Sequence, residues 1–376
     1  MILNIKKSIS WKKIFLITLN EEREIVRKEK LAFKNQRCEI ELDLANEKFI
    51  YFSNDKNNSQ IVVLSTLLDE IELLFNHKTR QYTCYLSIKN HEDYGMIRTI
   101  KFEDRNNLSF RRNKSKIVNI YTPSSYDANK EYGVIFMFDS QNIFNINKFG
   151  LYTKNADPYG GWQVEATIES VIKKYNDEYI VVGIDDSDQY RMAELMVHND
   201  DLEFKKEFID NYGITKKDYS RANLDKFGKF IIETVLTYIE NNYKIKKYNI
   251  GICGSSAGGN ASLYLGMKYP NIFRFIFTFT PAIGFYTDES LINFFKKGIN
   301  QDMPQPEIYY FQGVNGDLEK LLTFLNKNLV TNLIKAGINK ENIITYIEPT
   351  AEHNEDAWRY AFNYFMELHS KKSIDY

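Results

Sequence analysis

The amino-acid sequence predicts an α/β fold with a mostly parallel sheet, preceded by a small N-terminal domain of β-sandwich type. Two observations predict this division. Up to about residue 95 apolar residues alternate with polar ones, whereas from residue 96 continuous apolar runs alternate with amphipathic helical patterns. The chain has 376 residues, which is longer than one typical domain and leaves room for two. We therefore predict an accessory domain over residues 1–95 and an α/β domain over residues 96–376.

The predicted N-terminal domain rests on apolar residues with a period of two. In RCEIELDLA (37–45) the residues Cys38, Ile40, Leu42 and Leu44 share one face, with charged residues between them. The stretch QYTCYLSIK (81–89) has the same alternation. Alternation over such lengths is typical of half-buried antiparallel strands, and several short strands separated by polar breaks indicate a small sandwich.

The predicted α/β domain rests on strands that are apolar on both faces and are separated by helical patterns. Such strands form a mostly parallel sheet that helices cover on both sides. A polar connection over residues 186–224 is long enough to cover a site. The strand candidates are KIVNIYTP (116–123), GVIFMFD (133–139), YIVVGID (179–185), YNIGIC (248–253), FIFTFTP (275–281), IYYFQGV (308–314) and NIITYIE (342–348), and the clearest helices are WQVEATIESVIKKY (162–175) and KFGKFIIETVLTYIENNY (226–243).

Composition and charge exclude several classes of function. The net charge is −1 and basic residues are spread along the chain, so nucleic acid is not an expected partner. The apolar run IFLITL (14–19) is too short to span a membrane, and we expect no membrane partner and a cytoplasmic location. The three cysteines and five histidines lack metal-ligand spacing, so we predict no metal, no cofactor and no disulfide framework.

The stretch GICGSSAGGN (251–260) provides a candidate nucleophile. A predicted strand precedes it and a predicted helix follows it, which is the context of the strained turn called a nucleophile elbow. The pattern G-x-S-x-G fits Gly254, Ser256 and Gly258, whereas a frame centred on Ser255 lacks the flanking glycines. We therefore predict that Ser256 is the nucleophile.

A serine nucleophile needs a base, and the expected order along the chain is serine, acid, histidine. Only His353 and His369 follow Ser256. His353 lies in the polar stretch PTAEHNEDAW after the last predicted strand, where the base is expected. His369 shares a helical face with large aromatic residues, so we interpret it as a packing residue.

The remaining parts of the predicted site are an acid and two backbone donors. The loop NGDLEK after the strand IYYFQGV offers Asp317 and Glu319. We prefer Asp317 because it is closer to the strand end, and we keep Glu319 as the alternative. The oxyanion of an ester-cleaving reaction needs two N–H donors, for which we predict Ala257 and either Ser140 or Gln141.

Several stretches together resemble the putative esterase family, which includes esterase D, feruloyl esterases and enterochelin (siderophore) esterases. The resemblance covers roughly residues 96–370 and is carried by VIFMFDSQNIF (134–144), IVVGIDDSDQYRMAEL (180–195), GICGSSAGGNASLYLGMKYP (251–270), FTPAIGF (279–285) and EHNEDAWRYAF (352–362). It implies an α/β-hydrolase fold and a Ser–acid–His triad, with Ser256 and His353 at the matching positions. Ser140 stands where the family usually has glycine. An aromatic residue near the site is frequent in the family, and Trp162 is the candidate, either as a pocket wall or as a residue that packs on a helix start.

Three functional hypotheses follow. The leading one is a serine esterase that cleaves a small-molecule carboxylic ester through an acyl-enzyme. The second is a siderophore (enterochelin-like) esterase that acts on a large, oligomeric ester. The third is a non-catalytic hydrolase-fold scaffold whose β-domain binds carbohydrate or another protein. The presence of both Ser256 and His353 favours the catalytic hypotheses, and the oligomeric state, including a homo-oligomer, is left open.

Overall fold

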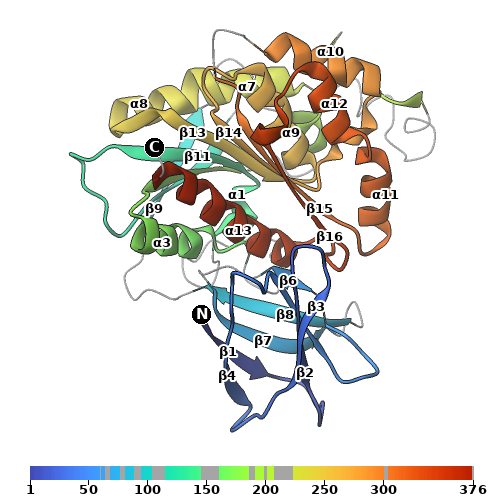
Figure 1. The fold of residues 1–376 in the computed structure, drawn as a ribbon. Helices are drawn as coiled ribbons and strands as arrows, with labels where there is room; N and C mark the ends of the chain where they lie inside the picture. Colours follow the sequence, from blue (N-terminus) through green and yellow to red (C-terminus); the bar gives the residue numbers. More distant parts are fainter. Residues whose placement is uncertain are drawn as a thin grey trace.

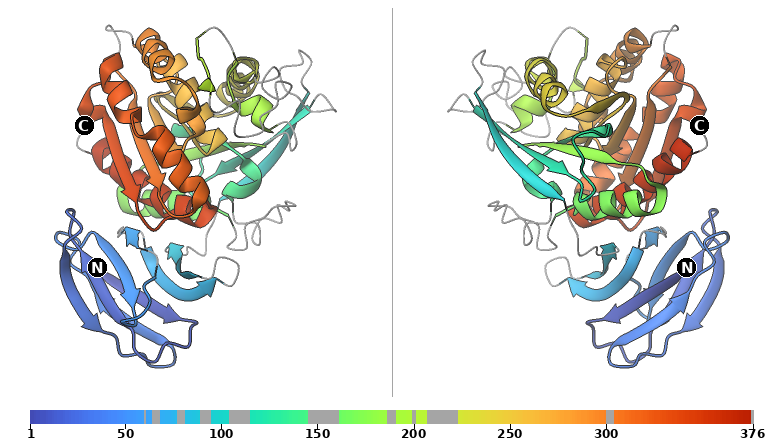
Figure 2. Two further views of the ribbon diagram at one scale, coloured as in Figure 1. Left: turned by 90° about the vertical axis from the view of Figure 1, so that its right-hand side faces the viewer. Right: turned by 90° about the vertical axis from the view of Figure 1, so that its left-hand side faces the viewer.

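The structure is a computed structural model that describes residues 1–59, 61–63, 68–76, 81–88, 95–103, 115–144, 161–185, 191–198, 201–206, 223–299 and 304–374. It contains a β-domain at the N-terminal end of the chain and a larger α/β domain (Figures 1 and 2). The predicted site-covering connection, residues 186–224, lies largely outside the described residues.

The N-terminal domain consists of two four-stranded sheets, as the sequence predicts. Apolar residues of both sheets, among them Leu3, Ile5, Leu16 and Ile50, are fully buried in a shared core, as the period-two alternation predicts. The pairs are antiparallel except for β1 with β7. One sheet has the order β4-β1-β7-β8 (β1 Ile2–Lys7, β4 Arg37–Glu41, β7 Leu68–Asn76, β8 Gln81–Ile88), and the other has the order β3-β2-β5-β6 (β2 Phe15–Leu19, β3 Ile25–Lys30, β5 Phe49–Ser53, β6 Val62–Val63).

The second domain is built on one eight-stranded sheet with the order β16-β15-β14-β13-β11-β12-β10-β9. Strand β10 pairs antiparallel with β9 and β12, and the other pairs are parallel, which confirms the predicted mostly parallel sheet. The predicted division at residues 95 and 96 falls between β8 and β9. The strands are β9 Met96–Glu103, β10 Ser115–Thr122, β11 Tyr132–Phe138, β12 Tyr179–Ile184, β13 Ile245–Ser255, β14 Phe275–Phe279, β15 Glu307–Gly313 and β16 Ile343–Glu348.

Helices cover both faces of this sheet. In Figure 1, α3 and α13 lie on the face toward the N-terminal domain, and α7 to α10 and α12 lie on the other face. Neighbouring strand residues such as Ile135 and Phe136 therefore enter two different cores, which is why the strands are apolar throughout. The helices are α1 Ser140–Ile143, α3 Val164–Tyr175, α4 Arg191–Leu195, α7 Leu224–Phe230, the π-helix η2 Ile231–Leu236, α8 Thr237–Asn242, α9 Ala257–Lys268, the 3₁₀ helix η3 Ala282–Phe285, α10 Asp288–Gly298, α11 Asp317–Asn326, α12 Leu329–Ala336, the 3₁₀ helix η4 Lys340–Asn342 and α13 Glu355–Ile374.

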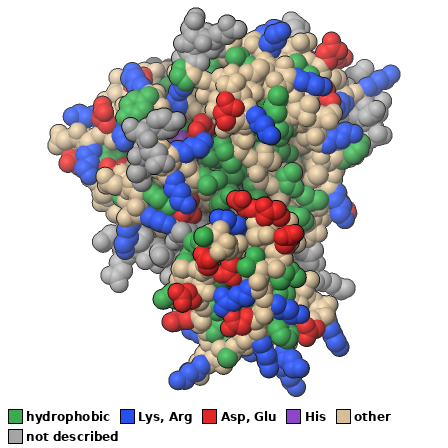
Figure 3. Space-filling view, in the orientation of Figure 1, with side chains coloured by type: hydrophobic (Ala, Val, Ile, Leu, Met, Phe, Trp, Pro, Cys, Tyr) green, Lys and Arg blue, Asp and Glu red, His purple; other side chains and the backbone are tan. Residues whose placement is uncertain are grey.

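The two domains share one hydrophobic core. Buried residues of the N-terminal strands belong to the same cluster as those of α3 and α13. On the face shown in Figure 3, acidic side chains gather at the upper end of the N-terminal domain, where it meets the α/β domain. The contact between the domains is therefore apolar inside and charged at its rim.

Candidate active site

Ser256 occupies the turn between β13 and α9, at the carboxyl edge of the sheet. Its backbone has φ 57° and ψ −121°, a conformation that is strained for a residue with a side chain. The Ser256 N–H donates to the carbonyl of Phe279 at 2.9 Å, and its own carbonyl accepts from the N–H of Ala282 at 2.9 Å. These contacts hold the strained turn in place, as expected for a nucleophile elbow.

The flanking glycines explain why the frame is centred on Ser256. A Cβ atom on Gly254 would lie 2.6 Å from the backbone of Gly258, so the strand end and the helix start approach too closely for a side chain. Ser255 is buried at the end of β13, with 6% of its surface exposed, whereas Ser256 is partly exposed. Of the two serines, Ser256 is the one that a substrate can reach.

Two helix starts meet beside Ser256. Ala257 is the first residue of α9, and Ser140 is the first residue of α1. The N–H group of a first helical residue has no acceptor within its own helix, so it is free to point at a ligand. A Cβ atom on Gly258 would lie 3.0 Å from the Asp139 carboxylate, which shows how closely the two helix starts approach. Gln141, the alternative to Ser140, is the second residue of α1 and is partly exposed.

The loop before α1 is held from three sides. Asp139 has a left-handed backbone, with φ 58°, and its carboxylate accepts from Nε and Nη2 of Arg191 at 2.6 and 2.8 Å. The Ser140 hydroxyl donates to Asp185 at 3.0 Å and accepts from the Asn119 side chain at 3.0 Å. The sequence analysis missed these contacts because the partners come from different strands and helices.

His353 lies in the loop between β16 and α13 and contacts a buried carboxylate. Its Nδ1 atom is 3.1 Å from Oε1 of Glu319. The Glu319 side chain has no exposed surface, and the His353 side chain is 17% exposed. The edge of the His353 ring packs against Trp358, with ring centres 5.0 Å apart and planes at 86°. The histidine is thus oriented by one carboxylate and one aromatic ring.

We predicted Asp317 as the carboxylate beside His353 and kept Glu319 as the alternative, and the structure places Glu319 there. Asp317 is the first residue of α11 and is exposed, whereas Glu319 is buried against His353. Two residues along an α-helix correspond to a rotation of about 200°, so the two side chains leave the helix on opposite sides. Distance from the strand end therefore did not predict which carboxylate contacts His353.

A set of buried amides and hydroxyls surrounds Glu319. The side-chain N–H of Gln312 donates to Glu319 Oε2 at 3.1 Å, and the hydroxyl of Thr280 is a further hydrogen-bond partner. The Gln312 amide oxygen accepts from Tyr310 at 2.9 Å and from Asn326 at 3.0 Å. Burial raises the pKa of Glu319, while its hydrogen bonds with His353 and Thr280 oppose that rise. A glutamine inside the apolar stretch IYYFQGV was the sequence signal for this network.

Contacts between side chains link the His353 loop to the loop at Ser140. The Asn142 side chain in α1 donates to Glu355, two residues after His353, at 3.1 Å. Trp162 lies between these segments: its backbone N–H donates to the Asn142 carbonyl at 2.9 Å, and its ring packs on Phe279 and Trp358, with ring centres 5.0 and 5.8 Å away. Trp162 is only 3% exposed and packs among aromatic residues, which favours the packing alternative for this residue.

A comparison with family models decides the family. The model described as "Putative esterase" matches residues 111–364, which is more than half of the chain. The chain belongs to the putative esterase family. The match covers the elements that carry Ser140, Ser256, Glu319 and His353, and it supports hydrolysis of carboxylic esters.

Solved structures share the fold of this family member. The BES protein from Bacillus cereus has a TM-score of 0.52 and 14% identity, over 75% of this chain and 96% of that one. A siderophore hydrolase from Aspergillus nidulans has a TM-score of 0.50 and 13% identity, over 75% and 97%. A feruloyl esterase module from Clostridium thermocellum, complexed with sinapinate, has a TM-score of 0.50 and 12% identity, over 74% and 89%. These likenesses confirm the α/β-hydrolase fold. No curated protein matches the sequence.

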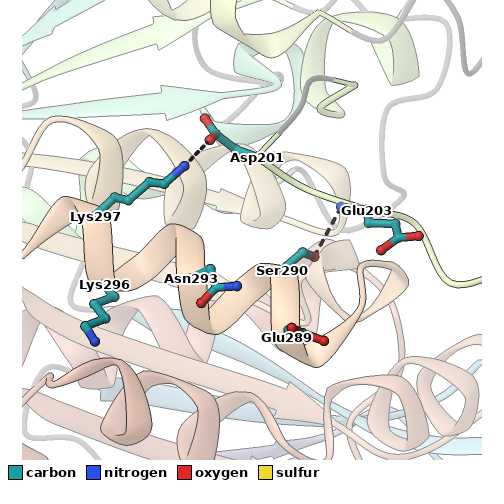
Figure 4. Close-up of a pocket in the computed structure, with 7 residues that line it drawn as sticks. All are labelled: Asp201, Glu203, Glu289, Ser290, Asn293, Lys296 and Lys297. Carbon is teal, nitrogen blue, oxygen red and sulfur yellow. Dashed lines mark hydrogen bonds and ion pairs between the residues drawn. The ribbon is translucent and has the colours of Figure 1, made fainter.

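A groove elsewhere on this esterase-family chain is separate from the residues above. It has a volume of about 700 Å³ and lies between α10 and the segment 201–203 (Figure 4). Lys297 pairs with Asp201 at 2.6 Å across it, and the Glu203 N–H donates to Ser290 at 3.1 Å. Its lining is charged and polar and includes none of the predicted site residues.

The described residues also show no metal centre and no helix that could span a membrane. No group of three or more His, Cys, Asp or Glu side chains in the described ranges could hold a metal ion. Within the same ranges, no helix has the length and apolar character that crossing a membrane requires.

Proposed function

We propose that this protein is a serine hydrolase of carboxylic esters, with Ser256 as nucleophile, His353 as base and Glu319 as the triad acid. The observation that carries the proposal is the strained Ser256 at a strand-to-helix turn, combined with the contact of His353 with buried Glu319 at the same edge of the sheet. Serine is a weak nucleophile and needs an adjacent base that a third group orients.

In the first half of the reaction, the Ser256 hydroxyl attacks the ester carbonyl carbon while His353 Nε2 takes the hydroxyl proton. Ionised Glu319 accepts the hydrogen bond from Nδ1–H and stabilises the imidazolium that forms. The N–H groups of Ala257 and Ser140 stabilise the oxyanion of the tetrahedral intermediate. When the intermediate collapses, the bond between the former carbonyl carbon and the ester oxygen breaks, and His353 gives its proton to that oxygen, which leaves as the alcohol.

In the second half, water replaces the alcohol. His353 removes a proton from the water as it attacks the acyl-Ser256 carbonyl, and the same N–H groups stabilise the new oxyanion. Collapse releases the carboxylic acid and returns the proton to Ser256. No cofactor takes part in this sequence of bond changes.

A fluorophosphonate probe with peptide mass spectrometry tests the proposal. We expect covalent labelling of Ser256 in the native protein and in Ser255→Ala, and none in Ser256→Ala. Ser255→Ala is the matched control because it removes the neighbouring hydroxyl and leaves the elbow frame intact. An unlabelled native protein would favour the non-catalytic scaffold.

Substrate class is separated by parallel assays. Short p-nitrophenyl esters test the general esterase, and a catecholate triester tests the siderophore-type alternative. A feruloyl ester tests whether an aromatic acyl group is preferred.

A cytoplasmic location is also part of the proposal, since the separated cysteines are suited to a reducing compartment. Cell fractionation tests the location.

A further inference from the structure

The N-terminal domain contacts the strand end from which the His353 loop begins. Strand β16 ends at Glu348, and residues 349–354 connect it to α13. Arg23, in the turn between β2 and β3, forms an ion pair with Glu348, with both Nη atoms 3.3 Å from Oε2. Its Nη2 also donates to the carbonyl of Ile347 at 3.0 Å. One N-terminal side chain thus binds both the backbone and the side chain of this strand end.

Glu348 links Arg23 to the loop that contains His353, because it contacts both. The Glu348 side chain has no exposed surface, and its Oε1 atom accepts from the Thr350 N–H at 3.2 Å and from the Thr350 hydroxyl at 3.0 Å. The Glu348 carbonyl accepts from the N–H of Ala351 at 3.2 Å. The first three loop residues are therefore folded around a buried carboxylate. A buried charge that loses its counter-ion is strongly unfavourable, so the arrangement depends on Arg23.

The Arg23 side chain is itself fixed in position. Its guanidinium carbon lies 3.6 Å from the ring centre of Phe49, and Phe49 stacks on Tyr346 of β16 with ring centres 6.0 Å apart. Arg23 has φ 66°, a left-handed backbone that glycine or asparagine adopts more readily in a hairpin turn. The residue whose side chain makes these contacts is therefore also one with a strained backbone.

A second contact binds the same loop to the N-terminal domain. The N–H of Ile61, just before β6, donates to the Thr350 hydroxyl at 2.7 Å. Thr350 is therefore linked to the N-terminal domain in two ways. It accepts a hydrogen bond from Ile61 directly, and it donates to Glu348, which is paired with Arg23. At its other end the loop is fixed by Asn354, whose side chain accepts from the Ala357 N–H at 3.0 Å at the start of α13.

We propose that Arg23 is a positioning residue for His353, so that the N-terminal domain is part of the esterase active site. This inference rests on the proposed function. When the cation is removed, Glu348 releases Thr350, the loop moves, and the His353 ring shifts away from Glu319 and from the position that the proposed reaction needs. Small displacements of a catalytic group reduce the rate of the chemical step far more than they reduce substrate binding.

The test compares Arg23→Met with Arg27→Met. Arg27 is the matched control because it lies in the same hairpin and contacts Glu29, Glu41 and Glu47, all within the N-terminal domain. We expect Arg23→Met to lower kcat about tenfold or more with KM changed less than about twofold, and Arg27→Met to leave both unchanged. Amide exchange in residues 349–354 should accelerate about tenfold in Arg23→Met alone.

Two further variants keep the inference testable if Arg23→Met does not fold. In Glu348→Gln the neutral amide needs no cation, so adding Arg23→Met to it should change kcat little. Thr350→Val breaks the other contact and should also lower kcat. A folded Arg23→Met with native kcat and native exchange in the loop overturns the inference. Loop exchange needs no substrate, so the two failures are distinguishable: a native protein without turnover contradicts the proposed function, and unchanged exchange in Arg23→Met contradicts the control of the loop by Arg23.

Discussion

A histidine–glutamate pair lies near each end of helix α13. The two pairs consist of the same residue types, but they differ in their position on the sheet and in their surroundings. His353 precedes the helix and lies 3.1 Å from Glu319, beyond the carboxyl end of β15. His369 lies in the late part of the helix, 3.3 Å from Glu307, the first residue of β15. The two pairs therefore lie at opposite edges of the same sheet.

The two carboxylates, Glu319 and Glu307, differ in burial and in the direction in which their pKa values shift. Glu319 is fully buried, and burial raises its pKa. Glu307 is 28% exposed; burial raises its pKa, but hydrogen bonds from His369, Lys372 and Tyr309 outweigh that and lower the pKa to about 2. The His369 ring packs on Phe275, with centres 4.2 Å apart. A histidine–carboxylate pair is thus not a catalytic site by itself. In the proposed mechanism, the strained serine and the helix starts at the carboxyl edge distinguish the His353 pair from the His369 pair.

The largest expected effect comes from removing each histidine. We expect His353→Ala to lower kcat/KM for a p-nitrophenyl ester by about 10⁴-fold or more, because the base is lost. His369→Ala should change kcat/KM less than about threefold and lower the melting temperature, because it opens a space in the core. Similar losses of activity in both variants, with both folded, would contradict the distinction between the two pairs.

The next effect separates the two acids of α11. Glu319→Gln should lower kcat about 10²-fold or more, because the neutral amide no longer stabilises the imidazolium. Asp317→Asn, two residues away and exposed, should leave kcat unchanged. Steady-state kinetics of both variants measure this. If Asp317→Asn were the more damaging substitution, Glu319 would not be the triad acid.

A smaller loss of activity is expected when Gln312, whose side-chain amide donates to Glu319, is replaced. Gln312→Leu removes the donor to Oε2, and we expect kcat to fall about tenfold with little change in KM. Gln305→Leu is the control at the opposite edge, where Gln305 donates to the Gly337 carbonyl at 2.8 Å. Equal kcat values in Gln312→Leu and the native protein would show that the buried network does not support the acid.

The smallest effect concerns stability at the amino edge. A carboxyl group with a lowered pKa in the folded state stabilises the protein above its ordinary pKa, near 4.5, and this contribution disappears as the pH falls toward about 2. Because Glu307 is partly exposed, we expect Glu307→Gln to cost about 1 kcal/mol at pH 7. Urea unfolding should show this difference shrinking between about pH 5 and pH 2. A difference that is constant with pH would contradict the assignment.

The sequence by itself determined the sheet, the nucleophile candidate and the histidine. These are local properties: strand periodicity, the glycines that flank Ser256, and the place of His353 between the last strand and the last helix. Hydrophobic patterning and steric limits act over a few residues, so one stretch of sequence contains enough information to predict them.

Only the tertiary structure decided which carboxylate meets His353 and what fixes its loop. Along the chain Asp317 was the preferred acid and Glu319 the alternative, and the packing of α11 against β15 turns Glu319 inward. Arg23 and Glu348 are 325 residues apart, and nothing local links them. Side-chain direction and long-range contacts depend on how whole elements pack, and that information is spread over the entire chain.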